Sequence, residues 1–323
     1  MKKLILIDGN AMLHRAYHAL PPLTNKAGLP TNAVYGFFTM LFKVITDLKP
    51  EYLIVCFDRK APTFRKQMYV GYQAKRPTMS DDLVPQVDIV HKSLDKARIS
   101  HYGIDGYEAD DLIGTISKQA VEKGLEVIIL SGDRDLLQLV NSHVLMLAPV
   151  VGITNMALFD EAKVKEKYKL NPSQFIDYKA LVGDNSDNYP GVAGIGPKTA
   201  ADLLNKYQNL ENLYKHISEL PLPMQEKLAN DAEQAALAKK LATIITDVPL
   251  KLEEEKALLS KMDMIGLKKE FEKLGFNSLL KRLLQLEERQ NSNLIHSASS
   301  GQNSKQSNKN NKKDNDNGQL NLL

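Results

Sequence analysis

The first half of the chain alternates short, continuous apolar runs with longer segments of helical periodicity. The apolar runs cover residues 4–8, 52–58, 126–133 and 144–149. Continuous runs of this length are typical of strands that are buried on both faces of a parallel sheet. Apolar residues at three- and four-residue spacing predict helices between most of them, at 32–48, 82–98 and 108–123. We therefore expect an α/β fold, with a parallel sheet and flanking helices.

From about residue 160 onward the strand pattern stops. Segments such as PSQFIDYKALVG and PKTAADLLNKY have helical periodicity, and so does the stretch 250–289. We expect an α/β domain over residues 1–170 and an all-helical domain over residues 171–289. Residues 290–323 contain nine Asn, six Ser and four Gln. Because such a composition cannot offset the entropy cost of ordering, a disordered tail is expected.

Composition narrows the class of protein. Of the 323 residues, 43% are hydrophobic and 25% are charged, as in an ordinary globular protein. No apolar run approaches the ~18 residues of a membrane helix. The single cysteine, Cys56, excludes an intrachain disulfide and a cysteine-based zinc site, which favours a reducing, cytoplasmic location. The net charge of +3 does not indicate a nucleic-acid partner, so only the placement of charges can do so.

Acidic side chains follow three of the four predicted strands, as Asp8, Asp58 and Asp133. Ligands of open parallel sheets bind beyond the carboxyl ends of the strands, so these carboxylates are expected to face one crevice. Asp135 lies two residues after Asp133. The helix predicted from residue 108 begins with three more acids, Glu108, Asp110 and Asp111.

Any one of these acids fits a helix cap or a turn. Six or seven carboxylates in one crevice, however, repel each other strongly. Bound divalent cations would neutralise them, and oxygen-only ligands select hard ions such as Mg²⁺ or Mn²⁺. Two such ions about 4 Å apart can activate a water molecule and stabilise the leaving oxygen of a phosphodiester.

Residues 59–80 contain six cations, no acid and three interleaved aromatic residues. Cations hold phosphates, and aromatic rings stack on unpaired bases. Because the segment starts directly after Asp58, we expect a mobile lid at the rim of the acidic crevice that guides a single strand, with Tyr72 and Arg76 among its contacts. The alternative is a solvated surface loop.

The stretch LVGDNSDNYPGVAGIGPKTA, residues 181–200, predicts two helices joined by a glycine-rich turn. Glycine allows backbone conformations that are closed to other residues, and the free N–H groups of the following helix can bind a phosphate of any sequence. Four residues are expected to contact DNA there: Gly194, Gly196, Lys198 and Thr199. Asp184 and Asp187 are expected to lean toward the acidic crevice. The alternative is a plain helical hairpin.

Five motifs follow one another along residues 1–280: LILIDGNAMLHRAYHAL, TFRKQMYVGYQAKRP, GYEADDLIGT, SGDRDLLQLV and GDNSDNYPGVAGIGPKTAADLL. Together they resemble the 5′→3′ exonuclease domain of bacterial DNA polymerase I, a member of the flap endonuclease superfamily. The resemblance implies a PIN-like α/β nuclease core followed by a helix-three-turn-helix DNA-binding domain. It also implies that nine acids hold two Mg²⁺ or Mn²⁺ ions, directly or through water: Asp8, Asp58, Glu108, Asp110, Asp111, Asp133, Asp135, Asp184 and Asp187.

The resemblance implies further roles and shows one departure. Arg65 is expected to contact the scissile phosphate. At Gln73 the family commonly has a lysine that assists the chemistry. Lys75, two residues on, is expected to take its place; the alternative is a reduced rate. The C-terminal Gln319–Leu323 resembles the Gln-Leu-x-Leu-Phe/Leu peptide that docks on the bacterial sliding clamp; the alternative is terminal sequence without a function. Backbone carbonyls of the glycine turn are expected to bind a potassium ion: Leu181, Val182, Pro190, Val192 and Ile195.

We therefore expect a monomeric, metal-dependent 5′→3′ exonuclease and 5′-flap endonuclease that cuts DNA, and RNA primers on DNA, in replication and repair. Because no polymerase domain follows, a stand-alone nuclease is expected. Two alternatives stay open. One is a non-cutting DNA-binding protein that recognises branched structures, which only Gln73 supports. The other is a PIN-type ribonuclease, which the glycine turn and the 59–80 segment disfavour.

Overall fold

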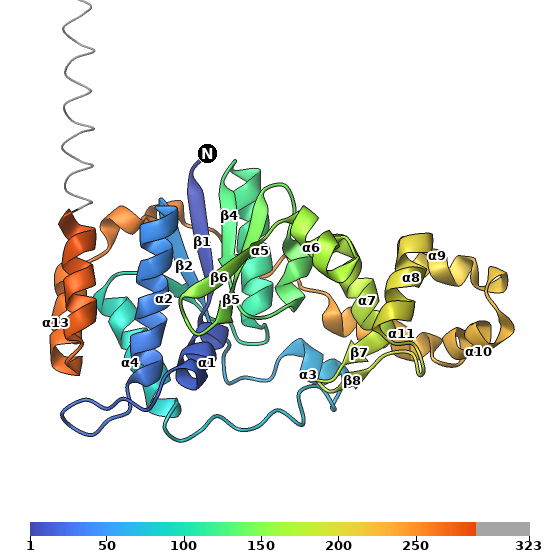
Figure 1. Cartoon of the computed structure of the whole chain (residues 1–323), viewed down its shortest axis with the longest axis horizontal. Coiled ribbons are helices and arrows are strands. Elements are labelled where there is room, and N and C mark those ends of the chain that lie inside the picture. The colour runs from blue at the N-terminus through green and yellow to red at the C-terminus, as the bar shows by residue number, and fades with distance from the viewer. Residues whose placement is uncertain (289–323) are drawn as a thin grey trace, which may run out of the picture.

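The computed structural model describes residues 1–288 and contains a six-stranded sheet with the order β3-β2-β1-β4-β5-β6 (Figure 1). Five strands are parallel, and β6 pairs with β5 in the antiparallel direction. The strands are β1 (Lys3–Asp8), β2 (Tyr52–Cys56), β3 (Ser100–Tyr102), β4 (Glu126–Leu130), β5 (Val144–Val151) and β6 (Asn155–Phe159). The predicted parallel sheet is confirmed. The structure adds β3 and β6, which lie at the two edges of the sheet. β3 has no apolar run, and the apolar run of β6 covers only residues 156–159.

Helices cover both faces of the sheet. α5 (Ala109–Glu122) lies on one face, and α1 (Gly9–Ala19), α2 (Asn32–Leu48) and α4 (Val84–Lys96) lie on the other. Side chains alternate along β1, so Leu4 and Leu6 join the core under α5, whereas Ile5 and Ile7 join the core under α1 and α2. The continuous apolar run of β1 therefore reflects a strand that is covered on both sides.

The second half forms a helical unit beside the α/β unit (Figure 1). Its glycine-rich turn joins α7 to α8 through a two-residue antiparallel hairpin, β7 and β8. No helix within residues 1–288 is long and apolar enough to cross a membrane. The elements of the helical unit are α6 (Glu161–Tyr168), η2 (Pro172–Gln174), α7 (Phe175–Val182), β7 (Gly183–Asp184), β8 (Tyr189–Pro190), α8 (Pro197–Tyr207), α9 (Leu210–Lys215), η3 (Ile217–Glu219), α10 (Leu222–Asn230) and α11 (Ala232–Ala242).

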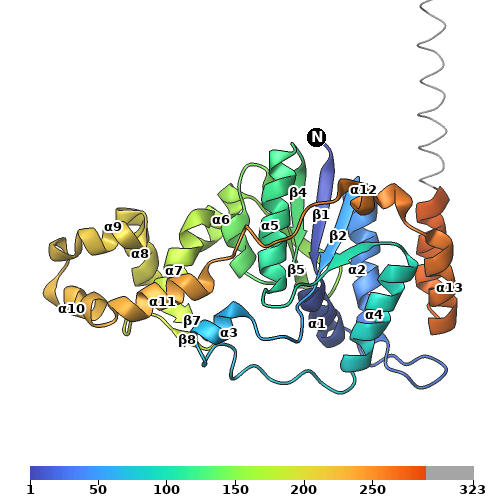
Figure 2. The ribbon, with the colours of Figure 1, turned by 180° about the vertical axis from the view of Figure 1, so that it is seen from behind.

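After α11 the chain returns to the α/β unit. Residues 243–253 run along α5 on the back of the molecule (Figure 2). Three side chains of α5, each one helical turn from the next, accept hydrogen bonds from backbone N–H groups of this return segment: Asp111, Thr115 and Gln119. These bonds tie the chain to the α/β unit directly after it leaves the helical unit.

The last helices pack on the α/β unit. They are α12 (Glu254–Ala257), η4 (Leu259–Lys261), α13 (Met264–Leu274) and a helix over residues 277–288. The rings of Phe271 and Phe38 lie 5.0 Å apart, and Phe271 shares a core with α2. The structure thus differs from the expected domain of residues 171–289, because residues 254–288 belong with the first unit. Apolar periodicity predicts an amphipathic helix but not the surface that this helix covers. The expected tail, 290–323, lies outside the described residues.

The segment 59–80 differs from the expected mobile lid. It contains a short helix, α3 (Phe64–Met68), and the side chains of Arg65 and Tyr72 are buried. The Tyr72 ring stacks on that of Tyr189 in β8, with centroids 6.3 Å apart, and both rings pack near Leu241 of α11. The segment therefore connects the two units, and Tyr72 is a packing residue rather than an exposed platform for bases.

Candidate active site

A cleft of about 520 Å³ opens where β1, β2 and β4 end. Its lining acids come from both units: from the strand ends, from the first turn of α5, from the start of η1 (Asp135–Leu139) and from the turn after β7. Seven of the nine predicted metal-binding acids line the cleft: Asp8, Asp58, Glu108, Asp110, Asp133, Asp135 and Asp187. The structure thus brings together residues that are up to 179 positions apart in the sequence.

Backbone N–H groups and a hydroxyl fix the acids at the strand ends. Asp8 ends β1 and caps α1, because its Oδ1 accepts from the Ala11 N–H at 3.0 Å, while its Oδ2 accepts from Ser131 Oγ at 2.7 Å. Asp58 Oδ1 accepts from the N–H of Ala109 at 2.8 Å. These bonds fix the carboxylate of Asp8 at the start of α1 and that of Asp58 at the start of α5.

Burial and mutual repulsion disfavour the charges of these acids. Burial, followed by the neighbouring Asp58 and Asp133, raises the pKa of Asp8 to about 7, against the opposing hydrogen bonds from Ala11 and Ser131. Burial likewise raises the pKa of Glu108 to about 7, although the guanidinium of Arg65 acts in the other direction. The cleft therefore carries more carboxylates than its own cations balance.

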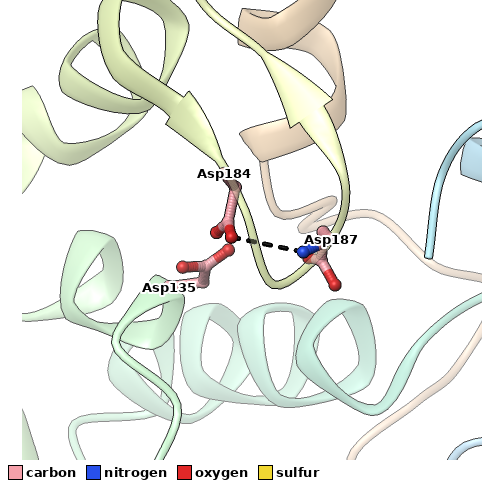
Figure 3. Close-up of side chains that lie close together, drawn as sticks. All are labelled: Asp135, Asp184 and Asp187. Carbon is pink, nitrogen blue, oxygen red and sulfur yellow. Dashed lines mark hydrogen bonds between the residues drawn. The ribbon is translucent and has the colours of Figure 1, made fainter. Parts of the chain in front are cut away.

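The donor set fits hard divalent cations. Asp135, Asp184 and Asp187 each offer an oxygen, and these oxygens lie within 4.8 Å of one another (Figure 3). Asp187 Oδ1 is buried and accepts no hydrogen bond from any group in residues 1–288. Carboxylate oxygens grouped in this way are the ligands that Mg²⁺ and Mn²⁺ prefer. Asp184 belongs to this cluster although it does not line the cleft.

Lys179 is the residue of this site that sequence reasoning missed. Lys179 lies in α7, and its ammonium group pairs with the carboxylates of both Asp135 and Asp184. Burial opposes its charge, but Asp135, then Tyr189 and Asp184, raise the pKa of Lys179, so the side chain remains an ammonium. The only sequence signal is its position five residues before Asp184, which does not reveal the contact with Asp135.

Asp111 and Arg65 form a buried pair, and this corrects both of their expected roles. Asp111 is 0% exposed, and both its oxygens accept hydrogen bonds from Arg65, at 2.7 and 2.8 Å. The other donors of Arg65 bind Glu108 Oε2, the Leu241 carbonyl and the Thr243 carbonyl. A guanidinium has five N–H donors, and all five are used here. Arg65 thus has no donor left for a scissile phosphate, and Asp111 serves as its counter-ion rather than as a metal ligand.

Tyr72 connects acids of the two units. Its hydroxyl lies 3.1 Å from Glu108 Oε2 and 3.2 Å from Asp187 Oδ2. Burial, followed by the charges of Glu108 and Asp187, raises the pKa of Tyr72, so the hydroxyl keeps its proton. Thr63 Oγ1 donates a third hydrogen bond to Glu108, at 3.1 Å. The segment 59–80 therefore positions Glu108 through Thr63, Arg65 and Tyr72.

The cations after Tyr72 lie in different places. Arg76 lines the cleft and its Nη2 lies 3.8 Å from Asp187 Oδ1. Gln73 also lines the cleft, in a left-handed backbone conformation (φ 55°), and its N–H donates to the Asp187 carbonyl at 2.8 Å. Lys75 is exposed and does not line the cleft. Lys75 therefore does not lie in the cleft beside Gln73, so the structure does not place it in the position of the family's lysine.

The glycine turn lies apart from the cleft lining. Gly194 has a φ of 74°, and its carbonyl accepts from Lys227 Nζ at 3.3 Å. Gly196 precedes Pro197 at the start of α8, with Lys198 exposed and Thr199 half-buried in the first turn. Three of the five carbonyls expected to bind potassium already accept a hydrogen bond: Leu181 from Val192 N–H, Val192 from Ile195 N–H, and Pro190 from Gln234 Nε2.

A parallel sheet that ends in an acidic cleft, next to a helical unit with a glycine turn, is the architecture of a nuclease. The chain belongs to the 5′–3′ exonuclease family. The N-terminal resolvase-like domain of that family matches residues 3–169, and its C-terminal SAM fold matches residues 170–264.

Two relatives show how much of the chain the likeness covers. A 5′–3′ exonuclease of Aquifex aeolicus is 39% identical over 283 residues, which are 88% of this chain and 96% of that protein. DNA polymerase I of Bacillus subtilis is 42% identical over 288 residues, which are 87% of this chain but 32% of the polymerase. The chain thus spans about a third of the polymerases that it matches.

Solved structures share the fold. A bacteriophage T5 5′-exonuclease with bound zinc superposes with a TM-score of 0.63 at 20% identity, covering 89% of this chain and 99% of that one. The catalytic core of Rad2 in complex with DNA gives a TM-score of 0.57 at 14% identity, covering 87% and 92% of the two chains. The α/β core followed by a helical domain is therefore confirmed.

Replacing Arg65 tests its structural role. Arg65→Met leaves Asp111 buried without a counter-ion, so we expect the free energy of unfolding to fall by about 3 kcal/mol or more. Urea denaturation in EDTA, without DNA, measures this loss. Lys66→Met, at an exposed neighbour, should stay within about 0.5 kcal/mol of the wild type. An Arg65 that contacted phosphate alone would leave the unfolding free energy unchanged.

The raised pKa values of Asp8 and Glu108 predict a pH dependence. A carboxyl whose pKa is raised on folding stabilises the fold at low pH, and this contribution is lost between the unfolded value near 4 and the folded value near 7. In EDTA the melting temperature should therefore fall by several degrees from pH 5.5 to 7.5. Mg²⁺ should raise it more at pH 7.5, because metal ligands must be deprotonated.

Scanning fluorimetry measures both effects. Asp8→Asn removes one of the shifted groups and should flatten the profile in EDTA. An equal Mg²⁺ effect at the two pH values would show that these carboxylates do not titrate with the metal.

Proposed function

We propose that the chain is a 5′→3′ exonuclease and 5′-flap endonuclease that cuts DNA, and RNA primers on DNA, with Mg²⁺ as its cation, during replication and repair. It acts as a monomer in the cytoplasm. The observation that carries the proposal is the convergence of seven carboxylates, from both units, on one cleft. Family membership supports the polarity of the reaction, since the Aquifex aeolicus relative is named a 5′–3′ exonuclease.

The residues divide into cation ligands and phosphate contacts. When bound, the cations polarise water and neutralise charge on the phosphate. Lys60, Lys66 and Arg76 line the same cleft and attract the nucleic-acid backbone. Eight acids remain as ligands, directly or through water, once Asp111 is set aside: Asp8, Asp58, Glu108, Asp110, Asp133, Asp135, Asp184 and Asp187.

The helical unit would hold the duplex. The free N–H groups at the start of α8, with Lys198 and Thr199, present a positive end to a phosphate. A potassium ion at the turn would use the second lone pair of carbonyls that already accept one hydrogen bond. If the ion contributes, DNA affinity is higher in KCl than in NaCl at equal ionic strength; equal affinities remove it.

A labelled 5′-flap duplex tests the activity. We expect cleavage at the flap base with Mg²⁺ and none with EDTA. Asp133→Asn removes one ligand and should lower kcat by on the order of 100-fold or more. Asp105→Asn, which removes an exposed partner of Arg59 outside the cleft lining, should leave the rate unchanged.

The same assay separates the alternatives. Flap binding without product in Mg²⁺ would indicate the non-cutting DNA-binding protein. Cleavage of single-stranded RNA with no action on the flap would indicate the ribonuclease.

A second proposal concerns the sliding clamp. Gln319–Leu323 lies outside the described residues, so the support is the resemblance of its sequence to the clamp-binding peptide. A tethered apolar motif would raise the effective concentration of the nuclease at the clamp. Deleting residues 319–323 should abolish clamp binding in calorimetry and leave flap cleavage intact. Unchanged affinity would remove the proposal.

A further inference from the structure

A protein cation stands inside the candidate metal cluster. The ammonium of Lys179 contacts one carboxylate oxygen of Asp135 and one of Asp184. The three side chains are 16%, 14% and 9% exposed, so the contact is shielded from solvent. Asp135 and Asp184 are also two of the three acids whose oxygens lie within 4.8 Å of one another. The lysine and a divalent ion would therefore use the same carboxylates.

The third acid of the cluster, Asp187, does not pair with Lys179 and has only a long ion pair with the exposed Arg76. The N–H of Asp187 donates to Asp184 Oδ1 at 3.2 Å, which sets the spacing of the two acids in the turn (Figure 3). Asp187 Oδ1 is buried and accepts no hydrogen bond within the described chain, and the Arg76 guanidinium lies 3.8 Å away. Lys179 thus balances Asp135 and Asp184, whereas the charge of Asp187 is balanced only by Arg76 at 3.8 Å.

Three acids at the strand ends and in the first turn of α5 lack such a partner. Asp8, Asp110 and Asp133 form no ion pair with any Lys, Arg or His of residues 1–288. The cleft therefore has two unequal parts. In the part formed by the strand ends a divalent ion meets carboxylates alone, whereas in the part formed by Asp135, Asp184 and Asp187 it meets an ammonium already in place.

We propose that Lys179 is the resident counter-ion of the Asp135–Asp184–Asp187 cluster and that a divalent ion enters this cluster only by displacing its ammonium. The inference rests on the proposed function, because it assumes that the acids hold divalent ions. Like charges in one site repel, so the ion at the strand ends binds first and more tightly. The lysine also holds α7 against η1 before that second ion arrives, as a metal bridge would.

Metal binding without DNA tests the inference. We titrate the full chain with Mn²⁺ by isothermal calorimetry. The wild type should take up one ion tightly and a second one weakly. Lys179→Met should bind the second ion at least 10-fold more tightly. Lys240→Met, an exposed lysine on the neighbouring α11, is the matched control and should behave as the wild type does.

A further variant locates the gain. Adding Asp184→Asn to Lys179→Met should abolish the tighter binding, because the second site then lacks a ligand. If Lys179→Met does not fold, Lys179→Gln keeps a donor for both carboxylates without the charge, and it should show the same gain.

The outcomes separate this inference from the proposed function. Equal affinity of the second ion in the wild type and the Lys179 variants overturns the inference alone, because the first ion still binds. A gain that persists in the double variant also overturns it. If neither protein takes up Mn²⁺, the inference and the proposed metal dependence both fail.

Discussion

The charge balance of buried carboxylates is the constraint on which this structure depends. Seven acids line one cleft, and burial with mutual repulsion raises the pKa of Asp8 and Glu108 to about 7. The chain neutralises only part of this set itself. Of the seven, Glu108 pairs with Arg65, Asp135 with Lys179 and Asp187 with Arg76. Arg65 and Lys179 also pair with Asp111 and Asp184, which do not line the cleft. The remaining deficit of positive charge is what makes the cleft a place for divalent cations and, through them, for phosphate chemistry.

The two internal cations act differently. Arg65 uses all five donors on buried acceptors from α5 and from the end of α11, so it is part of the framework. A residue held in this way cannot turn toward a substrate without leaving Asp111 unpaired, which is costly in a buried site. Lys179 has a single mobile ammonium, and its acceptors are themselves candidate ligands. Arg65 therefore belongs to the framework of the site, whereas Lys179 pairs with carboxylates that a divalent ion would use.

The sequence pattern predicts that the acids at the strand ends lie together, but it does not predict the cations that pair with the acids of the cleft. Continuous apolar runs mark buried strands, and the ends of parallel strands share one edge, so the amino-acid pattern alone is enough to bring Asp8, Asp58 and Asp133 together. No comparable rule connects Lys179 with Asp135, or Arg65 with Asp111, because these pairs form between elements whose packing has no sequence period. The same limit explains why helical periodicity alone predicts that the helices after residue 253 belong to the helical unit, although they pack on the α/β unit. Their apolar stripes are real, but the partner surface on α2 is set by the tertiary fold.

The route of the chain explains how acids of the second unit reach the first. The helical unit is entered after β6 and left through residues 243–253, which α5 holds with side chains at three successive turns. One of these, Asp111, also fixes Arg65, and Arg65 binds the Leu241 and Thr243 carbonyls at the end of α11. α11 in turn packs beside Tyr72 and Tyr189, next to the turn that carries Asp184 and Asp187. The buried pair of Arg65 and Asp111 therefore controls more than local stability, because it sets the position from which the second unit contributes its carboxylates to the cleft.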